Sequence, residues 1–573
     1  MSSNLEWADT LITAFVNRGV RHAILSPGSR STPLVIAAVR HKVLKKQVIL
    51  DERSAAFAAL GIGKATGRPA LLICTSGTAV TNYHPAVTEA RESGVPMVVL
   101  SADRPPSLRN LGSSQTTDQI KVFGGHAVFF HEAGEPRTGK EDLKRLRYLA
   151  SQAVDFAIER GGASHINLPF HKPLEPSAKE LANLHHDTDL FSGSDGPSPT
   201  VRSRSIQLGE AVYKRISKSR KPLIIAGPAN PHHALTEQIH NFAERLDAPV
   251  IAEAGSGVEP FGKNVIGFDR FMRSKKVRQK CRPDLILRFG DQPYSKAMLL
   301  ALEEWSEIPL YHFSARRAPQ DQAMSADRFI HCLPGDSPNL EPVKAKELNS
   351  WRERWQKLDH ASEQHLDKAL RETETLTDGH VFRSVSEKIP DSWNLMLSNS
   401  LPVRDMLTFG KSKPLQFVNR GTAGIDGICS TAIGLHLSTE RPTLCMIGDL
   451  AMLHDSNALY TLGSLKTGRP FVCIVLNNRG GNIFRMLPVY SEPDRALPED
   501  LYRDFFETPQ NVNIGHLAKA SDIPYQKVES TEALRKIDLS GVEGPLIVEC
   551  ITSADTSMDL RKALWNHTYE NYY

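Results

Sequence analysis

The sequence of 573 residues lacks the marks of several protein classes. Its seven cysteines are scattered and no CxxC pair occurs, which argues against a disulfide framework or a zinc site. No run of about 18 apolar residues is present, so we expect no transmembrane helix and no membrane insertion. The start, MSSNLEWA, has no basic stretch followed by an apolar core, so we expect no signal peptide. Together these absences favour a cytoplasmic protein.

An excess of charge of one sign is also missing. Lys and Arg total 69 and Asp and Glu total 65, so the formal net charge is only +4. Such a balance excludes the chain-wide basic surface that nucleic-acid binding usually needs, although it leaves room for a local cationic pocket. Hydrophobic residues make up 40% of the chain and charged residues 23%, as is usual for a globular protein.

Short apolar runs alternate with longer amphipathic stretches along the chain. Continuous apolar strands separated by helices are typical of parallel sheets that are covered on both faces. We therefore predict an α/β fold with mainly parallel sheets flanked by helices, in which ligands bind beyond the carboxyl ends of the strands. The runs that predict strands are His22–Leu25, Ala70–Cys74, Met97–Leu100, Leu223–Ala226, Leu285–Phe289, Leu444–Ile447, Phe471–Leu476 and Leu546–Cys550.

Two segments interrupt this alternation. Leu174–Ser205 contains SGSDGPSPT and several prolines, which predicts an interdomain linker. Asp336–Thr377 is rich in charge and in helix-forming residues, which predicts a tether followed by a helix. The segments divide the chain into three α/β domains, which we place at residues 1–185, 200–345 and 370–573.

Polar residues follow two predicted strands of the third domain. GDL occupies 448–450 and NNRGG occupies 477–481. Asp and Asn oxygens, together with a backbone carbonyl, suit Mg²⁺, which prefers to bridge phosphates. The glycines let the backbone approach a diphosphate closely. Two unrelated strand-to-helix turns are the alternative, but the pair after two apolar strands favours a metal–diphosphate site.

This pair resembles the fingerprint of thiamine diphosphate (ThDP) enzymes, GDG followed by NN, although the third position here is Leu450. The resemblance implies ThDP as cofactor and a metal ion, Mg²⁺ or Mn²⁺. It implies that Asp449, the Asn478 side chain and the Gly480 carbonyl hold the metal. The neighbouring residues that it places at the cofactor are Gly448, Leu450 and Gly481.

A glutamate in the first domain is the candidate acid. ThDP chemistry needs a carboxyl group that is hydrogen-bonded to the aminopyrimidine ring, in an apolar setting that raises its pKa. Glu52 follows a predicted strand and opens the small-residue helix AAFAALGIGKATG. A plain capping or helix-dipole role is the alternative for this carboxylate.

The turn TSGTA at 75–79, which includes Thr78, follows the next strand and suits a flat heteroaromatic ring. A glutamate at a helix start, then a strand, then TSGTA resembles the pyrimidine-binding domain of ThDP enzymes. In that family the glutamate of one subunit serves the ThDP of another. The resemblance therefore implies a homodimer or homotetramer with active sites at subunit interfaces.

Four arginines stand next to predicted strand ends: Arg30, Arg104, Arg404 and Arg420. Arginine suits a bidentate grip on carboxylates. Each one alone is equally compatible with a structural ion pair. Four of them on a nearly neutral chain favour polyanionic substrates, as in an enzyme that joins two dicarboxylates.

Longer motifs carry a closer resemblance. PGSRSTPL, DER, TSGTA, ADRPP, NSLPVRD, NRGTAGIDG, GDL and NNRGGNIF occur in this order between residues 27 and 484. They resemble the 2-succinyl-5-enolpyruvyl-6-hydroxy-3-cyclohexene-1-carboxylate (SEPHCHC) synthase family of menaquinone biosynthesis, which are ThDP-dependent transferases. The resemblance implies decarboxylation of 2-oxoglutarate and 1,4-addition of the remaining four-carbon unit to isochorismate, which gives SEPHCHC and CO₂.

The resemblance also implies a role for each matching residue. Glu52 would activate the cofactor, and Ile425 would hold ThDP in a bent conformation. The substrate-facing residues would be Ser400, Arg404 and Arg420 for 2-oxoglutarate, Ser29, Arg30, Arg104 and Gln115 for isochorismate, Ile483 and Phe484 as an apolar wall, and Lys296 from the middle domain.

Two other functions stay open at this point. The first is another ThDP-dependent 2-oxoacid decarboxylase or carboligase, such as an acetohydroxyacid synthase, which a comparison of pyruvate with 2-oxoglutarate as donor would separate. The second is a non-catalytic metabolite-binding protein that kept the fold. Absence of ThDP-dependent CO₂ release from 2-oxoglutarate would favour it.

Overall fold

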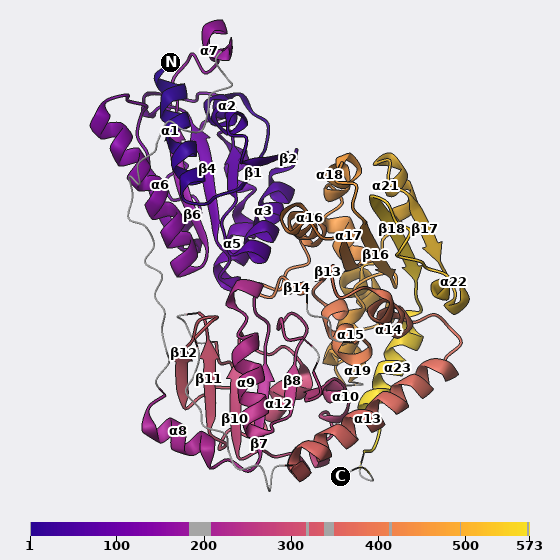
Figure 1. Ribbon diagram of the computed structural model, residues 1–573. Coiled ribbons are helices and arrows are strands. Elements are labelled where there is room, and N and C mark those ends of the chain that lie inside the picture. The colour runs from indigo at the N-terminus through magenta and orange to yellow at the C-terminus, as the bar shows by residue number, and fades with distance from the viewer. Residues whose placement is uncertain are drawn as a thin grey trace. The chain divides into compact units, whose positions relative to one another are not determined.

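Three six-stranded sheets, all paired in parallel, make up the framework of the protein (Figure 1). The computed structural model describes residues 2–182, 208–259, 261–316, 320–336, 349–411, 415–492, 494–569 and 572. Helices flank each sheet, so the predicted α/β class with parallel sheets is confirmed.

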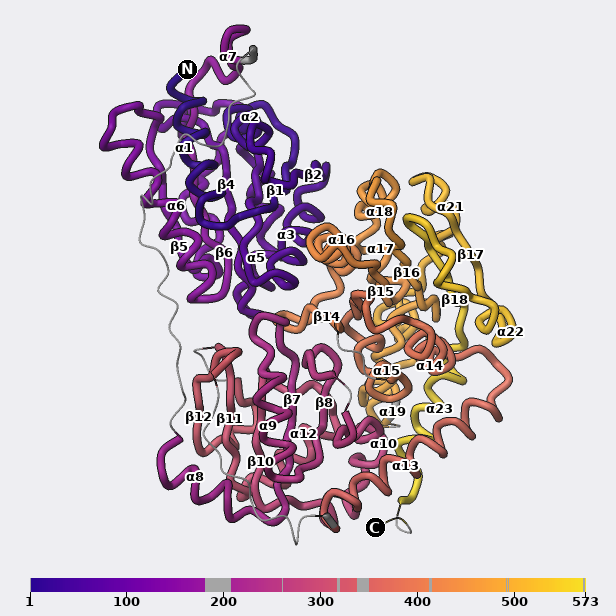
Figure 2. Tube along the Cα trace, viewed as in Figure 1, coloured from indigo at the N-terminus to yellow at the C-terminus, as the bar shows by residue number. Residues whose placement is uncertain are grey.

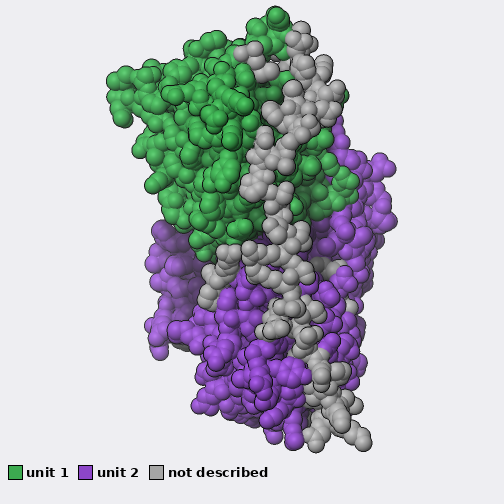
Figure 3. Space-filling view, turned by 60° about the vertical axis from the view of Figure 1, so that its left-hand side comes forward, with its two compact units in different colours: residues 1–201, 419–440, 455–464 green, residues 202–418, 441–454, 465–573 purple. Residues whose placement is uncertain are grey.

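The chain divides into two compact units (Figure 3). Unit 1 comprises residues 1–201, 419–440 and 455–464, and unit 2 comprises residues 202–418, 441–454 and 465–573. The first sheet lies in unit 1 and the other two lie in unit 2. Most of the predicted linker and tether, at 183–207 and 337–348, falls outside the described residues. The predicted domain limits of 1–185, 200–345 and 370–573 stay predictions.

The sheet of unit 1 has the strand order β2-β1-β3-β4-β6-β5. Alternate residues of its strands face two separate cores. Leu71 and Ile73 pack with the helices on one face, and Leu72 and Cys74 pack with those on the other. Coverage of both faces explains why the strands read as continuous apolar runs. The strands are β1 (His22–Leu25), β2 (Lys45–Val48), β3 (Leu71–Cys74), β4 (Met97–Asp103), β5 (Ala127–Glu132) and β6 (Ala163–Pro169).

The helices of unit 1 come from three segments of the chain. They are α1 (Ser3–Asn17), α2 (Thr32–Arg40), α3 (Glu52–Thr66), α4 (Thr78–Thr81), α5 (His84–Ser93), α6 (Lys140–Arg160), α7 (Ala178–Ala182), α16 (Ile428–Thr439) and α18 (Ala458–Ser464). Three short 3₁₀ turns accompany them: η1 (Ser29–Ser31), η2 (Pro106–Leu108) and η3 (Gly124–His126).

Helices α3 and α16 pack against each other at glycines. A Cβ on Gly61 would lie 2.1 Å from the carbonyl oxygen of Thr431, and one on Gly434 would lie 2.0 Å from that of Ala58. Only glycine permits so close an approach of two helix backbones. This contact is what joins residues 419–440 to the N-terminal part of the chain in unit 1.

The two sheets of unit 2 have the orders β12-β11-β10-β7-β8-β9 and β14-β13-β15-β16-β18-β17. The predicted strands at 223–226, 285–289, 444–447, 471–476 and 546–550 are confirmed, each within a residue at its ends. The strands are β7 (Pro222–Ala226), β8 (Val250–Ala252), β9 (Asn264–Val265), β10 (Leu285–Phe289), β11 (Leu310–Ser314), β12 (Arg328–His331), β13 (Asn394–Leu397), β14 (Gln416–Val418), β15 (Thr443–Gly448), β16 (Phe471–Asn477), β17 (Tyr525–Val528) and β18 (Pro545–Ile551).

One hydrophobic core continues through both sheets of unit 2 and includes Trp355. Trp355 belongs to the long helix α13, whose course Figure 2 shows. This helix confirms the helix predicted after the tether. The helices are α8 (Glu210–Ser217), α9 (Thr236–Leu246), α10 (Phe268–Phe271), α11 (Lys275–Lys280), α12 (Lys296–Glu304), α13 (Asn349–Glu372), α14 (Asp378–Lys388), α15 (Leu401–Phe409), α17 (Asp449–His454), α19 (Pro488–Ser491), α20 (Glu499–Tyr502), α21 (Ile514–Ala520), α22 (Thr531–Arg535) and α23 (Ala554–Asn566). Shorter turns are η5 (Pro231–His233), η6 (Asn482–Met486) and the π-helical turn η7 (Arg503–Glu507).

All seven cysteines are buried, and no disulfide joins them in the part of the chain that the structure describes. Among the described residues, no helix is long and apolar enough to cross a membrane.

Candidate active site

Unit 1 brings three of the sequence motifs to one edge of its sheet. Strands β1, β3 and β4 are neighbours, and the segments that follow them are 26–31, 75–79 and 104–106. The PGSRS turn lies directly on the TSGTA turn, because a Cβ on Gly28 would meet the Thr75 side chain at 2.3 Å. Ser29 and Thr78 are both exposed at this edge. The convergence of these predicted residues is the arrangement expected at the carboxyl ends of parallel strands.

Two of the predicted arginines lie close together at this edge. Arg30 is buried, and its Nη1 donates a hydrogen bond of 2.7 Å to the Phe170 carbonyl oxygen. Burial lowers the pKa of Arg30 and the nearby Arg104 lowers it further, while the carboxylates of Asp103 and Glu175 oppose the fall. Arg104 is half-buried and donates from Nη2 to the Ser114 carbonyl oxygen at 3.1 Å. Two neighbouring guanidinium groups form a local cationic site that suits a carboxylate.

Gln115 is exposed beside the TSGTA turn and has a positive φ of 52°. A Cβ on Gly77 would contact its Cα at 3.5 Å. The turn itself is fixed by Gln119, whose Oε1 accepts from the Gly77 N–H at 3.0 Å. Gln119 in turn donates to Asn167 at 2.8 Å, within a buried polar network. The structure thus joins Gln115 to the Arg30 and Arg104 edge.

Glu52 is the first residue of α3, as the sequence predicts, but it does not cap the helix. The capping residue is Asp51, whose Oδ1 accepts from the Arg53 N–H at 2.8 Å and the Ser54 N–H at 3.3 Å. The Glu52 side chain is therefore available for another role. Burial raises the pKa of Glu52 above its ordinary value. The neighbouring Asp51 carboxylate raises it further, while a backbone hydrogen bond of Glu52 itself opposes the rise.

Glu52 lines an open pocket of about 360 Å³ within unit 1. Tyr460, from α18, lines the same pocket and is 60% exposed. Leu50 at its rim is 71% exposed, and Val48 just before it is 60% exposed. Exposed apolar side chains next to a half-buried carboxyl group form a surface that a second molecule would be expected to cover.

The NRGTAGIDG loop at 419–427 is held by a buried ion pair. Glu89 accepts from the Gly421 N–H at 3.1 Å and from the Thr422 N–H at 2.7 Å. The Lys64 ammonium lies 3.7 Å from Glu89, and both side chains are almost fully buried. Removal of one partner from such a pair leaves a buried charge uncompensated. Glu89 thereby fixes the loop that carries the predicted residues.

Arg420 and Ile425 lie within this loop and are both half-buried. Gly427 closes the loop with a φ of +65°, and a Cβ there would meet the Phe57 ring at 2.0 Å. The end of the loop therefore packs against α3, the helix that Glu52 begins.

In unit 2, a second set of motifs meets at the edge of the C-terminal sheet. Strands β13, β15 and β16 are neighbours, so Ser400, Asp449 and Asn478 follow adjacent strand ends. Ser400 precedes α15 with a φ of +68°, which is strained for a residue other than glycine. Arg404 donates from Nη1 to the Ser400 carbonyl oxygen at 2.6 Å. Such local strain is typical of functional turns.

The three predicted metal ligands are linked by short contacts. Asp449 Oδ2 accepts from the Gly480 N–H at 2.8 Å. The Asn482 Nδ2 group donates to Asn478 Oδ1 at 2.9 Å and to the Gly480 carbonyl oxygen at 3.3 Å. Both oxygens therefore face the same group, the side-chain amide of Asn482. No group of three or more His, Cys, Asp and Glu side chains suits a metal in the described chain, so a metal here would need amide and carbonyl oxygens beside the Asp449 carboxylate.

This donor set fits a hard cation that bridges phosphates. Burial raises the pKa of Asp449 to about 6, and the Asp378 carboxylate adds to the rise, while the N–H groups of Leu450 and Gly480 oppose it. A positive ion would relieve the cost of burying this charge. A Cβ on Gly448 would find open space within 4 Å, which leaves room for a diphosphate beside the backbone.

The two asparagines of the NN motif have different surroundings. Asn477 donates from Nδ2 to Glu549 on β18 at 2.5 Å. This hydrogen bond ties the start of the NNRGG turn to the neighbouring strand. Asn478 carries the oxygen that faces Asn482. Gly480 has a φ of +130° and lies against the Glu507 carbonyl oxygen, where a Cβ would come within 2.3 Å. Gly481 donates its N–H to the same oxygen at 2.7 Å.

The remaining predicted residues of unit 2 lie in η6 and α12. Ile483 and Phe484 are half-buried in η6, and Phe484 meets Phe506 edge-on with the ring centroids 5.7 Å apart. Lys296 is exposed at the start of α12. Within the described chain, no hydrogen bond or ion pair joins Lys296 to the other predicted residues.

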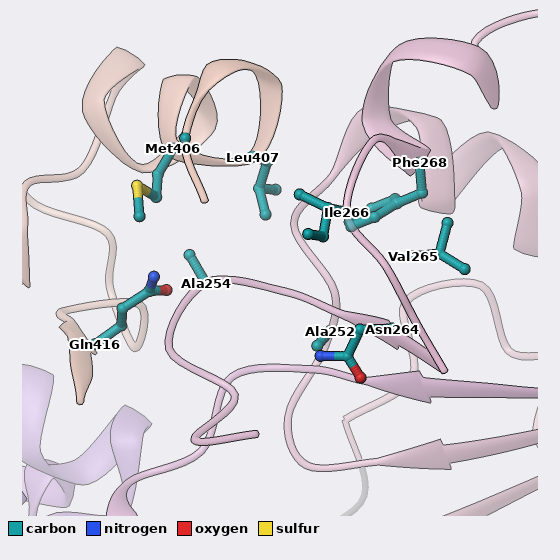
Figure 4. Close-up of a pocket in the computed structure, with 10 residues that line it drawn as sticks. Ala252, Ala254, Asn264, Val265, Ile266, Phe268, Met406, Leu407 and Gln416 are labelled. Carbon is teal, nitrogen blue, oxygen red and sulfur yellow. The ribbon is translucent and has the colours of Figure 1, made fainter. Parts of the chain in front are cut away.

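A small pocket of about 20 Å³ lies beneath α15 in unit 2 (Figure 4). Met406, Leu407 and Phe268 line it, and the amide of Gln416 faces it. It has room for about one water molecule and not for a substrate. The Nε2 group of Gln416, which has no hydrogen-bond partner among the described residues, would suit such a water.

Sequence reasoning missed the residues that support the site. Glu89 belongs to none of the motifs, and Lys64 and Asn482 lie within AAFAALGIGKATG and NNRGGNIF but received no role, although all three support the predicted loops. Asp378 and Arg561 meet behind Asn478 although they are 183 positions apart. Only Asn482 offered a signal, because it directly follows NNRGG.

Comparison with known proteins identifies both ends of the chain. Residues 5–122 match the family described as thiamine pyrophosphate enzyme, N-terminal TPP binding domain. Residues 405–550 match thiamine pyrophosphate enzyme, C-terminal TPP binding domain. Thiamine pyrophosphate is a second name for ThDP.

Several curated proteins named 2-succinyl-5-enolpyruvyl-6-hydroxy-3-cyclohexene-1-carboxylate synthase are similar over nearly their full length. The one from Oceanobacillus iheyensis is 32% identical over 565 residues, which covers 96% of this chain and 94% of that protein. The one from Haloarcula marismortui is 34% identical, with 99% and 98% covered. The one from Microcystis aeruginosa is 33% identical, with 98% of each covered.

Proposed function

Since the chain belongs to the SEPHCHC synthase family of ThDP-dependent enzymes of menaquinone biosynthesis, we propose that it decarboxylates 2-oxoglutarate and adds the remaining four-carbon unit to isochorismate. The products are SEPHCHC and CO₂. The observation that carries this proposal is the convergence of Asp449, Asn478 and Gly480 at one sheet edge, beside the strained turn that bears Ser400.

When bound, ThDP supplies a nucleophilic thiazolium carbon and an electron sink for the charge left by CO₂. In this chain, the Asp449 carboxylate, Asn478 Oδ1 and the Gly480 carbonyl oxygen would hold Mg²⁺ or Mn²⁺ against the diphosphate. Gly448, Leu450 and Gly481 would border the diphosphate with backbone. The convergent oxygens and the open space at Gly448 support this role.

Glu52 would hold a proton at its carboxyl group and share it with the aminopyrimidine ring of ThDP. Its raised pKa and its freedom from capping support this role. Thr78 would lie under the ring, and Ile425 would keep the cofactor bent. The exposed apolar rim of the Glu52 pocket supports assembly into a homodimer or homotetramer, in which a second copy brings the cofactor. We place the enzyme in the cytoplasm.

The substrates would be held by two groups of polar residues. Ser400 and Arg404, with Arg420, would bind the carboxylate of 2-oxoglutarate that is retained. Isochorismate would be bound by the other set, whose clustering at one edge supports a shared ligand. That set comprises Ser29, Arg30, Arg104 and Gln115. Ile483 and Phe484 would form an apolar wall of the site, and Lys296 would reach the site from the middle domain.

The direct test is incubation of the protein with ThDP, Mg²⁺, 2-oxoglutarate and isochorismate, followed by mass analysis of the product. We expect a product with the mass of SEPHCHC and one CO₂ per turnover. The parallel reaction with pyruvate as donor is the control. Preference for pyruvate would instead indicate a general 2-oxoacid carboligase, such as an acetohydroxyacid synthase.

The arginines of the two residue groups should affect KM for different substrates. For Arg404→Ala we expect KM for 2-oxoglutarate to rise about 30-fold, equivalent to about 2 kcal/mol for a lost charged contact, with little change for isochorismate. Arg104→Ala is the matched variant and should show the reverse pattern. Steady-state kinetics with each substrate varied in turn measures both. If Arg404→Ala affects isochorismate more strongly, the two groups are assigned the wrong way round.

A further inference from the structure

A buried network of charges lies directly behind Asn478. Asp378, the first residue of α14, accepts from Thr552 Oγ1 at 2.6 Å and from Arg561 Nη2 at 2.6 Å. It also accepts from Asn478 Nδ2 at 3.3 Å. Arg561 pairs in a bidentate manner with Asp405, at 2.7 Å and 2.6 Å. The side chains of Asp378, Asp405 and Arg561 are at most 2% exposed.

The network determines which way the Asn478 amide points. An ionised carboxylate accepts hydrogen bonds and cannot donate them, so the NH₂ group of Asn478 must face Asp378. The Asn478 oxygen then faces the opposite side, where it meets the Asn482 amide at 2.9 Å. A flipped amide would place its oxygen against the carboxylate and its NH₂ group where a cation is expected.

Arg561 keeps Asp378 in place. Burial lowers the pKa of Arg561, but Asp405 and Asp378 raise it more strongly, so the guanidinium stays charged between two carboxylates. Asp405 lies in α15 next to Arg404, the proposed ligand of the 2-oxoglutarate carboxylate. One guanidinium therefore ties the metal loop to the helix of the substrate turn.

We propose that Asp378, held by Arg561 and Thr552, is a positioning residue that orients the Asn478 oxygen toward the metal ion. This inference rests on the proposed metal site. Outer partners that orient a ligand typically change metal affinity by about 10–100-fold when they are removed. A contact to Asn478 is not needed for a network that only stabilises the fold, since Arg561 would remain paired with Asp405.

Asp378→Ala separates these roles. Arg561 and Asp405 would stay behind as a neutral pair, so the variant is expected to fold. We expect the Mg²⁺ concentration for half-maximal ThDP binding to rise about 10–100-fold. The measurement is a Mg²⁺ titration at fixed ThDP, followed by tryptophan fluorescence, so it does not depend on turnover. Asp378→Asn retains an acceptor oxygen and should restore most of the affinity.

A matched control is Asp269→Ala. Asp269 is also buried in unit 2 and accepts from Ser295 at 2.6 Å and Thr408 at 3.2 Å, but among the described residues no hydrogen bond or ion pair joins it to the metal loop. Its loss should lower the unfolding temperature without changing the Mg²⁺ requirement. Thr552→Val keeps every charge and is the fallback if Asp378→Ala does not fold; we expect a loss of about fivefold, equivalent to one hydrogen bond.

The outcomes distinguish a failure of the role proposed for Asp378 from a failure of the proposed metal site. A wild-type protein that binds ThDP equally well without Mg²⁺ would overturn the metal site and the inference together. A wild-type protein that needs Mg²⁺, with Asp378→Ala matching it, would overturn the inference alone. The inference alone would also be overturned if Asp269→Ala weakened Mg²⁺ binding as much as Asp378→Ala does.

Discussion

Turnover of a Glu52→Gln variant is expected to fall about a thousandfold, within the range that one acid–base group contributes. Glutamine has the same size but cannot share a proton with the aminopyrimidine ring. The helix start should survive the change, because Asp51 and not Glu52 caps α3. ThDP binding should therefore stay close to that of the wild type while kcat falls.

The measurement is CO₂ release from 2-oxoglutarate, with ThDP affinity determined separately. Asp51→Asn is the matched variant, because asparagine caps a helix about as well as aspartate. It removes a carboxylate next to Glu52 and should cost less than about fivefold in kcat, the equivalent of one hydrogen bond. A Glu52→Gln enzyme with wild-type turnover would exclude the proton-sharing role.

For Asp449→Ala we expect Mg²⁺-dependent ThDP binding to weaken by at least about 100-fold, the upper end of what even outer partners of a metal contribute. The change removes the one carboxylate ligand. It also leaves the Gly480 N–H, now 2.8 Å from Asp449, without its acceptor, so the ligand loop loses its brace. Equilibrium titration of ThDP at several Mg²⁺ concentrations checks this. Unchanged affinity would place the diphosphate elsewhere.

The two inactive variants also test the proposed assembly when they are mixed. If Glu52 of one copy serves the cofactor at Asp449 of another, a mixed dimer contains one intact site and one doubly altered site. Co-expression should then recover about a quarter of wild-type activity for random pairing in a dimer, because half the dimers are mixed and each has one working site. No recovery would indicate that both residues serve the same site within one chain.

Much of the fold was predictable because parallel strands that are buried on both faces appear in the sequence as continuous apolar runs. The strand β2 (KKQV at 45–48) does not follow this pattern, since it lies at the sheet edge and is largely exposed. The short strands β9 and β14 contain too few residues to give a signal. The division into units was also hidden, because the contact of Gly61 with Gly434 joins helices that are far apart in sequence.

The candidate site was predictable where chemistry is concentrated in contiguous motifs. Asp449 and Asn478 follow neighbouring strands, so their motifs meet once the sheet forms. The supporting residues Glu89, Asp378 and Arg561 act through pairings that cross more than one hundred positions, and no local spacing reports them. Helix capping was the alternative role for Glu52, but Asp51 is the residue that caps α3. The sequence does not separate two adjacent carboxylates, whereas the side-chain hydrogen bonds do.

The close packing of α3 against α16 bears on how this protein can be recombined with its relatives. A chimera with a single crossover after the first sheet would pair the α3 of one parent with the α16 of the other. Any side chain larger than hydrogen at Gly61 or Gly434 would then collide with a foreign backbone. Productive module exchange must transfer residues 419–440 and 455–464 together with the N-terminal segment, as one discontinuous block.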